Sequence, residues 1–269
     1  MADILYGLVW VGGLALTGLS ILSLGLPRFA GLGRPVLVAT WLAATVALAI
    51  RWSEVGHPPI FGTFENTYAA SWSVLFACVV ASFTSRAPKG LGQLWRIGSP
   101  WVVALMLYGS RFRSDPVPLT ISEQSLWVDV HVLFAWLAFV PFLLAATMAV
   151  LMLFGFEPFG LTRQSAEERM TQMVLVGFAA FTAMLLTGSF YLYVLFGTFW
   201  QWEIVETLSL LTWIAYGLAI HARLFYRWGG RGFYLAMTVI LPLMLAAYLV
   251  WSVFPNTFHF FDVPLVRPY

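Results

Sequence analysis

Four histidines carry most of the chemistry that this sequence offers: His57, His131, His221 and His259. Ionisable side chains are costly in or beside a membrane span, and they commonly mark a functional site there. A neutral imidazole can bind a metal through one of its ring nitrogens. The single cysteine, Cys78, cannot form an internal disulfide or a cysteine-ligated zinc or iron–sulfur site. The histidines are therefore the first candidates for a binding site.

A second chemical signal is the aromatic and acidic stretch FGTFWQWEIVETLSLLTW, residues 196–213. Trp202, Glu206, Ser209 and Trp213 are spaced by four, three and four residues, which predicts that they share one face of a helix. The two glutamates of this stretch fall in the first turn of that helix, where carboxylates suit the positive end of the helix dipole. A belt of interfacial aromatic residues and a simple helix cap would explain the same residues. Composition alone leaves both interpretations open.

The elements that must position these residues are membrane-spanning helices. The chain has 269 residues, of which 61% are hydrophobic and 10% are charged, whereas soluble domains carry about a quarter charged residues. A helix needs about 20 apolar residues to cross a bilayer. The sequence therefore predicts an all-α, polytopic membrane helix bundle, a single integral membrane domain over residues 1–269. The eight predicted helices, the fourth being the shortest, lie at roughly 4–26, 35–51, 65–84, 94–110, 125–155, 171–196, 204–225 and 232–254.

The distribution of Lys and Arg predicts the orientation of this bundle, because cytoplasmic loops carry an excess of these residues. Ten lie in the connections after the odd-numbered helices, and four lie on the opposite side: Arg51, Arg111, Arg113 and Arg267. Both termini and the tryptophan-rich loop, residues 196–206, are then expected outside. His57, His131 and His259 fall on the same outer side. His221 lies about 15 residues into the seventh helix, which takes it roughly 20 Å inward, close to the inner face.

Histidines on one side of a membrane, beside a tryptophan-rich loop, favour a flat aromatic ligand held axially by imidazoles. Neutral imidazole is a good haem ligand, and aromatic side chains hold a large planar macrocycle. His131 has Trp127 one helical turn before it, and phenylalanines flank His259 in PNTFHFFD. For each histidine alone, an ordinary surface or interfacial residue is the alternative. Zinc is a competitor, but no H-x-x-x-H or H-E-x-x-H spacing supports it.

Residues 196–223, FGTFWQWEIVETLSLLTWIAYGLAIHAR, resemble the signature of the CcsA/CcmC/CcmF group of haem-handling membrane proteins, and most closely that of CcsA in System II cytochrome c biogenesis. In that group a loop written W-G-x-x-W-x-W-D-x-x-E-T leads into a helix that ends in a histidine and an arginine. The matching residues are Gly197, Trp200, Trp202, Glu206, Thr207, Thr212, Trp213, His221 and Arg223.

The resemblance extends over roughly residues 50–262, with several motifs in the family's order. GHPPIFGTFENTYAASW, residues 56–72, is similar to a G-H-x-P-x-x-x-x-Y-E-S region, and WVDVHVLFAWLAF, residues 127–139, to a family helix that begins H-V. The tail that contains His259 is similar to the last external histidine of the family. The loop itself departs from the pattern at three places: Phe196 replaces a tryptophan, Glu203 an aspartate, and Ile204-Val205 a Pro-Lys pair.

The resemblance implies a role for each candidate residue. His131 and His259 would be the axial ligands of non-covalent haem b in transit at the external loop. His221 would belong to a second haem site near the inner face, whose opposite ligand comes from a separate CcsB (Ccs1-like) subunit. His57 matches a family position suited to loop shaping or to contact with a haem propionate. Further cofactor-binding residues would be Gly197, Trp200, Trp202, Glu206 and Trp213, and the outer cations available for propionates are Arg51, Arg111, Arg113 and Arg267.

We therefore expect a haem-transport and haem-presentation protein of cytochrome c maturation, in the bacterial inner membrane or a thylakoid-type membrane. The expected partners are the lipid bilayer, the CcsB/Ccs1-like subunit and an apocytochrome c with a Cys-x-x-Cys-His motif, and no nucleic acid is expected. The chain would be a subunit of a cytochrome c synthase, and no residue stands out as an acid–base catalyst. Two alternatives stay open: a HemX-like regulatory or haem-binding relative without synthase activity, and a membrane subunit with permanent b-type haem that transfers electrons.

Overall fold

The structure is a computed structural model of the chain, and it describes residues 2–84, 91–112, 114, 115, 119, 123–250 and 253. Within these residues the chain is α-helical, as predicted. Seven helices are long and apolar enough to cross a membrane. The chain is therefore an integral membrane protein. The helix left out of the seven is α4 (Trp95–Gly109), because its 15 residues fall short of the roughly 20 that a span needs.

All eight predicted helices form within the described residues. Their bounds are α1 Ala2–Gly25, α2 Gly33–Val55, α3 Thr63–Thr84, α4 Trp95–Gly109, α5 Leu126–Leu153, α6 Arg163–Phe196, α7 Ile204–Phe225 and α8 Gly230–Leu249. Short 3-10 helices lie at Pro27–Leu32, Leu91–Gln93 and Pro158–Gly160. The helices fall into two compact units: unit 1 contains α1–α4 and unit 2 contains α5–α8.

The largest difference from a predicted helix boundary is at the start of α6. The prediction began this helix at residue 171 and left the polar stretch before it in a connection. The helix instead begins at Arg163, where the Thr162 hydroxyl accepts a hydrogen bond from the backbone N–H of Ser165. The segment RQSAEER is rich in good helix formers, so polarity does not stop the helix. The resulting 34 residues rise about 50 Å, which exceeds the roughly 30 Å hydrocarbon core of a bilayer.

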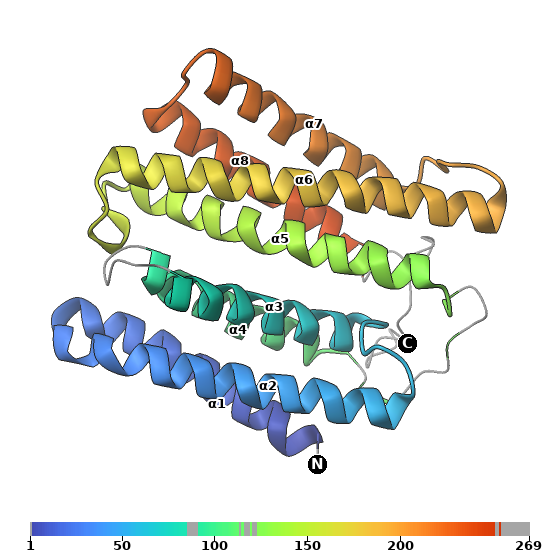
Figure 1. The fold of residues 1–269 in the computed structure, drawn as a ribbon, viewed down its shortest axis with the longest axis horizontal. Helices are drawn as coiled ribbons and strands as arrows, with labels where there is room; N and C mark the ends of the chain where they lie inside the picture. The colour runs from blue at the N-terminus through green and yellow to red at the C-terminus, as the bar shows by residue number, and fades with distance from the viewer. Residues whose placement is uncertain are drawn as a thin grey trace, which may run out of the picture. The chain divides into compact units, whose positions relative to one another are not determined.

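Unit 1 is built on α1 and α3. Helix α1 packs against α2 and α4, and α3 packs against α4 and α2 (Figure 1). A hydrogen bond from the indole Nε1 of Trp72 to the Thr45 hydroxyl (2.8 Å) joins α3 to α2. This unit carries His57 in the connection between α2 and α3.

Unit 2 is built on the antiparallel pair α5 and α6, which lie side by side along their length (Figure 1). Helix α8 packs against α5 and α7, and α7 also packs against α6. In the core, the Phe142 ring of α5 stacks on the Tyr216 ring of α7 with centroids 3.7 Å apart. The connection 197–203 between α6 and α7 lies at the same end of the unit as the start of α5 (Figure 1). We call this end the loop end of unit 2.

Candidate functional site

The tryptophan-rich loop begins with a left-handed glycine. Gly197 has φ +71° at the C-terminus of α6, and its N–H donates to the carbonyl of Tyr193 (2.9 Å). An L-residue in this region costs roughly 1–2 kcal/mol, which explains why glycine suits the position. Trp202 adopts the same region with φ +58° and is 73% exposed. Strained backbone of this kind tends to occur at functional sites.

The position of Trp202 corrects one prediction. The helical spacing predicted that Trp202 shares a face with Glu206, Ser209 and Trp213, but α7 begins after it, at Ile204. The chain turns at Trp202, so its side chain is exposed while Glu206 and Ser209 are buried. The left-handed turn of the backbone is the physical reason, and spacing alone does not reveal it.

The two acids of the loop cap α7. Glu203 and Glu206 form a capping box, in which each side chain accepts from the backbone N–H of the other residue. Oε2 of Glu206 accepts from the N–H of Gln201 (2.9 Å) as well as from that of Glu203 (3.2 Å). The helix-cap interpretation is thereby confirmed for these acids. Glu206 is buried, and its carboxylate fixes the path of the loop between Gln201 and the start of α7.

The aromatic residues of the loop are held by one another. Phe199 stacks on Tyr193 with centroids 4.4 Å apart and planes 7° apart. Trp200 and Trp202 meet edge to face at 6.1 Å. Phe196, Phe199 and Trp202 are exposed, so the loop offers several aromatic faces to a flat ligand. The indole Nε1 of Trp200 is buried and has no hydrogen-bond partner among the described residues, so it is a donor that an oxygen of a ligand could satisfy.

Trp213 has a different setting. Its indole Nε1 donates to the Thr182 hydroxyl (2.9 Å), and its ring stacks on Phe178 with centroids 5.3 Å apart. Both partners belong to α6, so this tryptophan joins α7 to α6 below the loop.

His131 lies in α5 at the loop end of unit 2. Its Nδ1 is 2.9 Å from the carbonyl oxygen of Met184 in α6. A carbonyl can only accept, so Nδ1 carries the proton and Nε2 carries the lone pair that a metal needs. The nearby Trp127 ring packs on Phe190 of α6 with centroids 4.3 Å apart. This arrangement is the one in which metal-binding histidines are usually held.

His221 lies at the opposite end of unit 2. It is exposed near the end of α7, with Nδ1 2.9 Å from the carbonyl oxygen of Gly217 and its ring stacked on Phe225. By the same argument its Nε2 carries the lone pair. Two residues further along α7, Arg223 contacts Thr171 of α6. Since 17 residues of α6 separate Thr171 from Gly188, beside His131, the two histidines lie roughly 25 Å apart along the helix axis. The two histidines therefore lie at opposite ends of unit 2.

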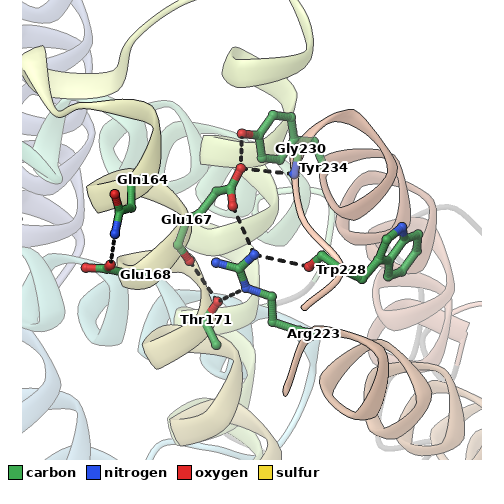
Figure 2. Close-up of polar contacts among 8 residues, drawn as sticks. All are labelled: Gln164, Glu167, Glu168, Thr171, Arg223, Trp228, Gly230 and Tyr234. Carbon is green, nitrogen blue, oxygen red and sulfur yellow. Dashed lines mark hydrogen bonds and ion pairs between the residues drawn. The ribbon is translucent and has the colours of Figure 1, made fainter. Parts of the chain in front are cut away.

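A polar cluster that the sequence did not predict surrounds the end of α7 (Figure 2). Glu167 of α6 is its centre. The carboxylate accepts from the Arg223 guanidinium (2.9 Å), from the N–H of Gly230 (3.0 Å) and from the Tyr234 hydroxyl (2.5 Å). These donors come from α7 and from α8, so one carboxylate joins three helices. Its signal in the sequence was an acid and an arginine at the same predicted end of the bundle.

Arg223 makes further contacts in this cluster. Its Nε donates to the Thr171 hydroxyl (3.2 Å), and its Nη1 donates to the carbonyl oxygen of Trp228 (3.1 Å) (Figure 2). The ion pair is largely shielded from solvent, with side-chain exposures of 18% for Arg223 and 12% for Glu167. The cluster therefore fixes the rotation of the last turn of α7.

His57 belongs to unit 1 and sits beside a buried ion pair. Its Nδ1 lies 2.9 Å from the carbonyl oxygen of Pro58. Close by along the chain, Arg51 Nε donates to Glu65 Oε1 (2.8 Å), and Arg51 Nη2 donates to the carbonyl oxygen of Ser114 (2.6 Å). The pair is buried on both sides.

The proposed set of propionate-binding cations is altered by this pair. Arg51 was expected to be available, but its guanidinium is buried against Glu65. Arg111 is exposed. Three predicted residues, Arg113, His259 and Arg267, lie outside the described residues.

Comparisons with known proteins point to one family. The sequence profile of the family described as "Cytochrome C assembly protein" matches residues 32–257. The cytochrome c biogenesis protein CcsA of Chlamydomonas reinhardtii is 25% identical over 226 residues, which cover 80% of this chain and 64% of that protein. CcsA of Guillardia theta is 23% identical, over 77% of each chain. CcsA of Prochlorococcus marinus strain AS9601 is 22% identical, over 80% of each chain.

A solved structure shares the fold. The structure titled "Cytochrome c Heme Lyase CcmF" matches with a TM-score of 0.72 and 17% sequence identity. The match covers 98% of this chain and 47% of that one. The chain thus spans about half the length of this structural relative and less than two thirds of the Chlamydomonas protein.

Proposed function

This chain belongs to the Cytochrome C assembly protein family, as the tryptophan-rich loop led us to expect, and we propose that it holds haem for attachment to an apocytochrome c. The haem would lie at the loop end of unit 2, with His131 as one axial ligand. It would be bound non-covalently and be passed on, so haem is the cargo of the protein. Its iron and vinyl groups supply the chemistry of attachment, and the chain binds and orients it.

The observation that carries this proposal is the hydrogen bond between His131 and Met184. A histidine that only packs between helices needs no particular tautomer. Here Nδ1 lies 2.9 Å from a carbonyl oxygen, which selects the tautomer with the proton on Nδ1, orients the ring and makes Nε2 a more basic, stronger iron ligand. We propose His259, from the tail, as the opposite ligand.

The loop fits a planar, acidic macrocycle. The exposed faces of Phe199 and Trp202 suit stacking on a porphyrin. The indole N–H of Trp200, which has no hydrogen-bond partner within the part of the chain that the structure describes, suits a propionate oxygen. Gly197 and Glu206 would act through the backbone, because one ends α6 and the other caps α7. Trp213 would support the loop from below through its contacts with α6.

Two departures from the family pattern are compatible with this role. Glu203 replaces an aspartate, yet it still caps α7 as an aspartate would. Phe196 replaces a tryptophan and keeps an exposed aromatic face. The third departure, Ile204-Val205 for Pro-Lys, removes a cation that could meet a propionate.

The second site would be at His221, which is exposed on α7. We propose that it binds haem near the inner face together with a ligand from a CcsB-like membrane subunit. Haem would enter there and move outward to His131. In this scheme both termini and the loop 196–206 face the outside of a bacterial inner membrane or the lumen of a thylakoid-type membrane. His57 lies in the connection between α2 and α3, beside the Arg51–Glu65 ion pair. We propose that it shapes this connection of unit 1.

Attachment of haem in cells tests this proposal. The chain would be expressed with its CcsB-like subunit and a Cys-x-x-Cys-His apocytochrome in bacteria that lack their own maturation genes, and covalent haem would be scored on gels by its peroxidase activity. We expect holocytochrome with the wild-type chain and a loss of at least tenfold with His131→Ala. Haem binding without attachment would favour the HemX-like alternative. Equal yields with and without the chain would refute the proposal.

A further inference from the structure

Helix α6 carries two glycine notches on the face that meets α5. A methyl group on Gly188 would lie 2.8 Å from Nδ1 and Cε1 of His131, and one on Gly177 would lie 2.8 Å from the ring of Phe142. Real Cβ atoms essentially never come this close to other atoms, so each ring occupies space that only glycine leaves open. Small residues permit this close approach between membrane helices.

The two notches repeat with the same spacing. Phe142 follows His131 by 11 residues, and Gly177 precedes Gly188 by 11 residues. Eleven residues make about three helical turns, so the notches share one face of α6 and the rings share one face of α5. The antiparallel pair therefore places one flat ring in each notch. The Phe142 ring is also stacked on Tyr216, which anchors the register of the pair.

The notch at Gly188 has a hydrogen bond between its ring and α6 that the notch at Gly177 lacks. The His131 ring, seated against Gly188, donates its Nδ1–H to the Met184 carbonyl one turn earlier in α6. A side chain larger than hydrogen at position 188 would push the ring away from this oxygen. The acceptor is a backbone group, so no substitution of Met184 removes it.

We propose that Gly188 is a positioning residue for haem binding, which sets the orientation and the tautomer of His131 through this notch. The inference rests on the proposed function, in which His131 ligates haem. It adds that the strength with which Nε2 of His131 donates its electron pair to iron is set by the contact of the ring with α6. A hydrogen bond from Nδ1–H to a carbonyl makes the imidazole more basic and stabilises ferric iron. Loss of the bond should therefore weaken haem binding and raise the midpoint potential of the bound haem.

Two matched glycine substitutions test the proposal. Gly188→Ala and Gly177→Ala introduce the same methyl group on the same face of α6 with the same 2.8 Å clash. Gly177→Ala is the more severe of the two, because its methyl also lies 3.2 Å from the carbonyl oxygen of Ala138. We expect Gly188→Ala alone to weaken haem binding, by about 10- to 100-fold, and to raise the potential. Equal effects of both substitutions on haem would mean that the notch only packs the helices.

His131→Phe separates ligation from packing, because a phenylalanine at 131 reproduces the Phe142–Gly177 arrangement. The variant should fold and lose the haem signal of this site. If His131→Phe and His131→Ala bind haem as the wild type does, the proposed function fails. If they lose haem while Gly188→Ala matches Gly177→Ala, this inference fails alone.

A measurement on the haem-free wild type keeps the inference testable even if the alanine variants fail to fold. The ¹⁵N chemical shifts of the histidine rings, recorded after selective labelling, report which nitrogen carries the proton. We expect the His131 resonance to show a protonated Nδ1, assigned by its loss in His131→Phe. A proton on Nε2 would overturn the inference.

Discussion

Removing the Glu167 carboxylate should destabilise unit 2 more than any single surface change would. Glu167→Ala deletes the carboxylate that accepts hydrogen bonds from Arg223, Gly230 and Tyr234. The Arg223 side chain, which is only 18% exposed, then loses its counter-charge. Breaking a buried pair by removing one partner costs about 3–5 kcal/mol. Because both side chains keep some exposure and water can reach them, we expect the lower end, about 3 kcal/mol.

A double-mutant cycle measures the pair itself. The free energy of unfolding would be obtained by denaturant titration in detergent for wild type, Glu167→Ala, Arg223→Met and the double variant. Arg223→Met replaces the cation by an apolar side chain that suits the end of a membrane helix. The double variant should recover part of the loss, with a coupling free energy of about 2 kcal/mol.

A methyl group added at Gly229 tests the Glu167–Arg223 pair in an independent way. A methyl group there would lie 2.6 Å from Arg223 Nη1 and 2.8 Å from Glu167 Oε2, whereas one on Gly18 meets nothing within 4 Å. We expect Gly229→Ala to cost about 1–3 kcal/mol and Gly18→Ala to be neutral or slightly stabilising. Additive effects of Glu167→Ala and Arg223→Met on the unfolding free energy, within about 0.5 kcal/mol, together with a harmless Gly229→Ala, would refute the interpretation that the Glu167 cluster holds the end of α7 to α6 and α8.

Three further outcomes are expected. Glu65→Ala should cost about 3 kcal/mol in unfolding free energy, because it leaves Arg51 buried without its partner, and a double-mutant cycle with Arg51→Met would show it as coupling. Glu206→Ala should cost about 1 kcal/mol and speed proteolysis within the tryptophan-rich loop, because the cap of α7 is lost; unchanged proteolysis would contradict the capping role. Cys78 is buried, so a maleimide should label it only after denaturation in SDS, and rapid labelling of the folded protein would contradict the packing of α3.

Seven of the described helices were predictable because each contains a long apolar run, and that signal can be read from the segment alone. The start of α6 was not predicted correctly, because the polar segment that contains Glu167 resembles a loop in its hydropathy. Its helix-forming residues and the Thr162 cap are what extend the helix to Arg163. Hydropathy identifies the apolar part of a membrane helix, but it does not detect a polar extension of the same helix beyond that apolar part.

In the candidate site, too, some features could be predicted from the sequence and others could not. Spacing grouped Glu206, Ser209 and Trp213 correctly on α7 and misplaced Trp202, because a left-handed backbone at a non-glycine residue leaves no pattern in the sequence. The sequence made His131 a candidate ligand through its position and the family resemblance. The notch at Gly188 depends instead on the register of α5 and α6, which brings together two residues more than 50 positions apart in the chain. Contacts of this kind are decided by tertiary packing and become visible only in the structure.

The central claim, that His131 ligates haem, is tested most directly by the reduced absorption spectrum of the purified chain. The wild type, His131→Ala and His221→Ala would be purified in detergent, and haem would be extracted with acidified solvent to show that it is not covalently bound. The account predicts a non-covalent b-type spectrum that weakens or shifts in His131→Ala and that changes in a separate way in His221→Ala. A wild type that binds no haem even after reconstitution, or a His131→Ala spectrum identical to that of the wild type, would contradict it.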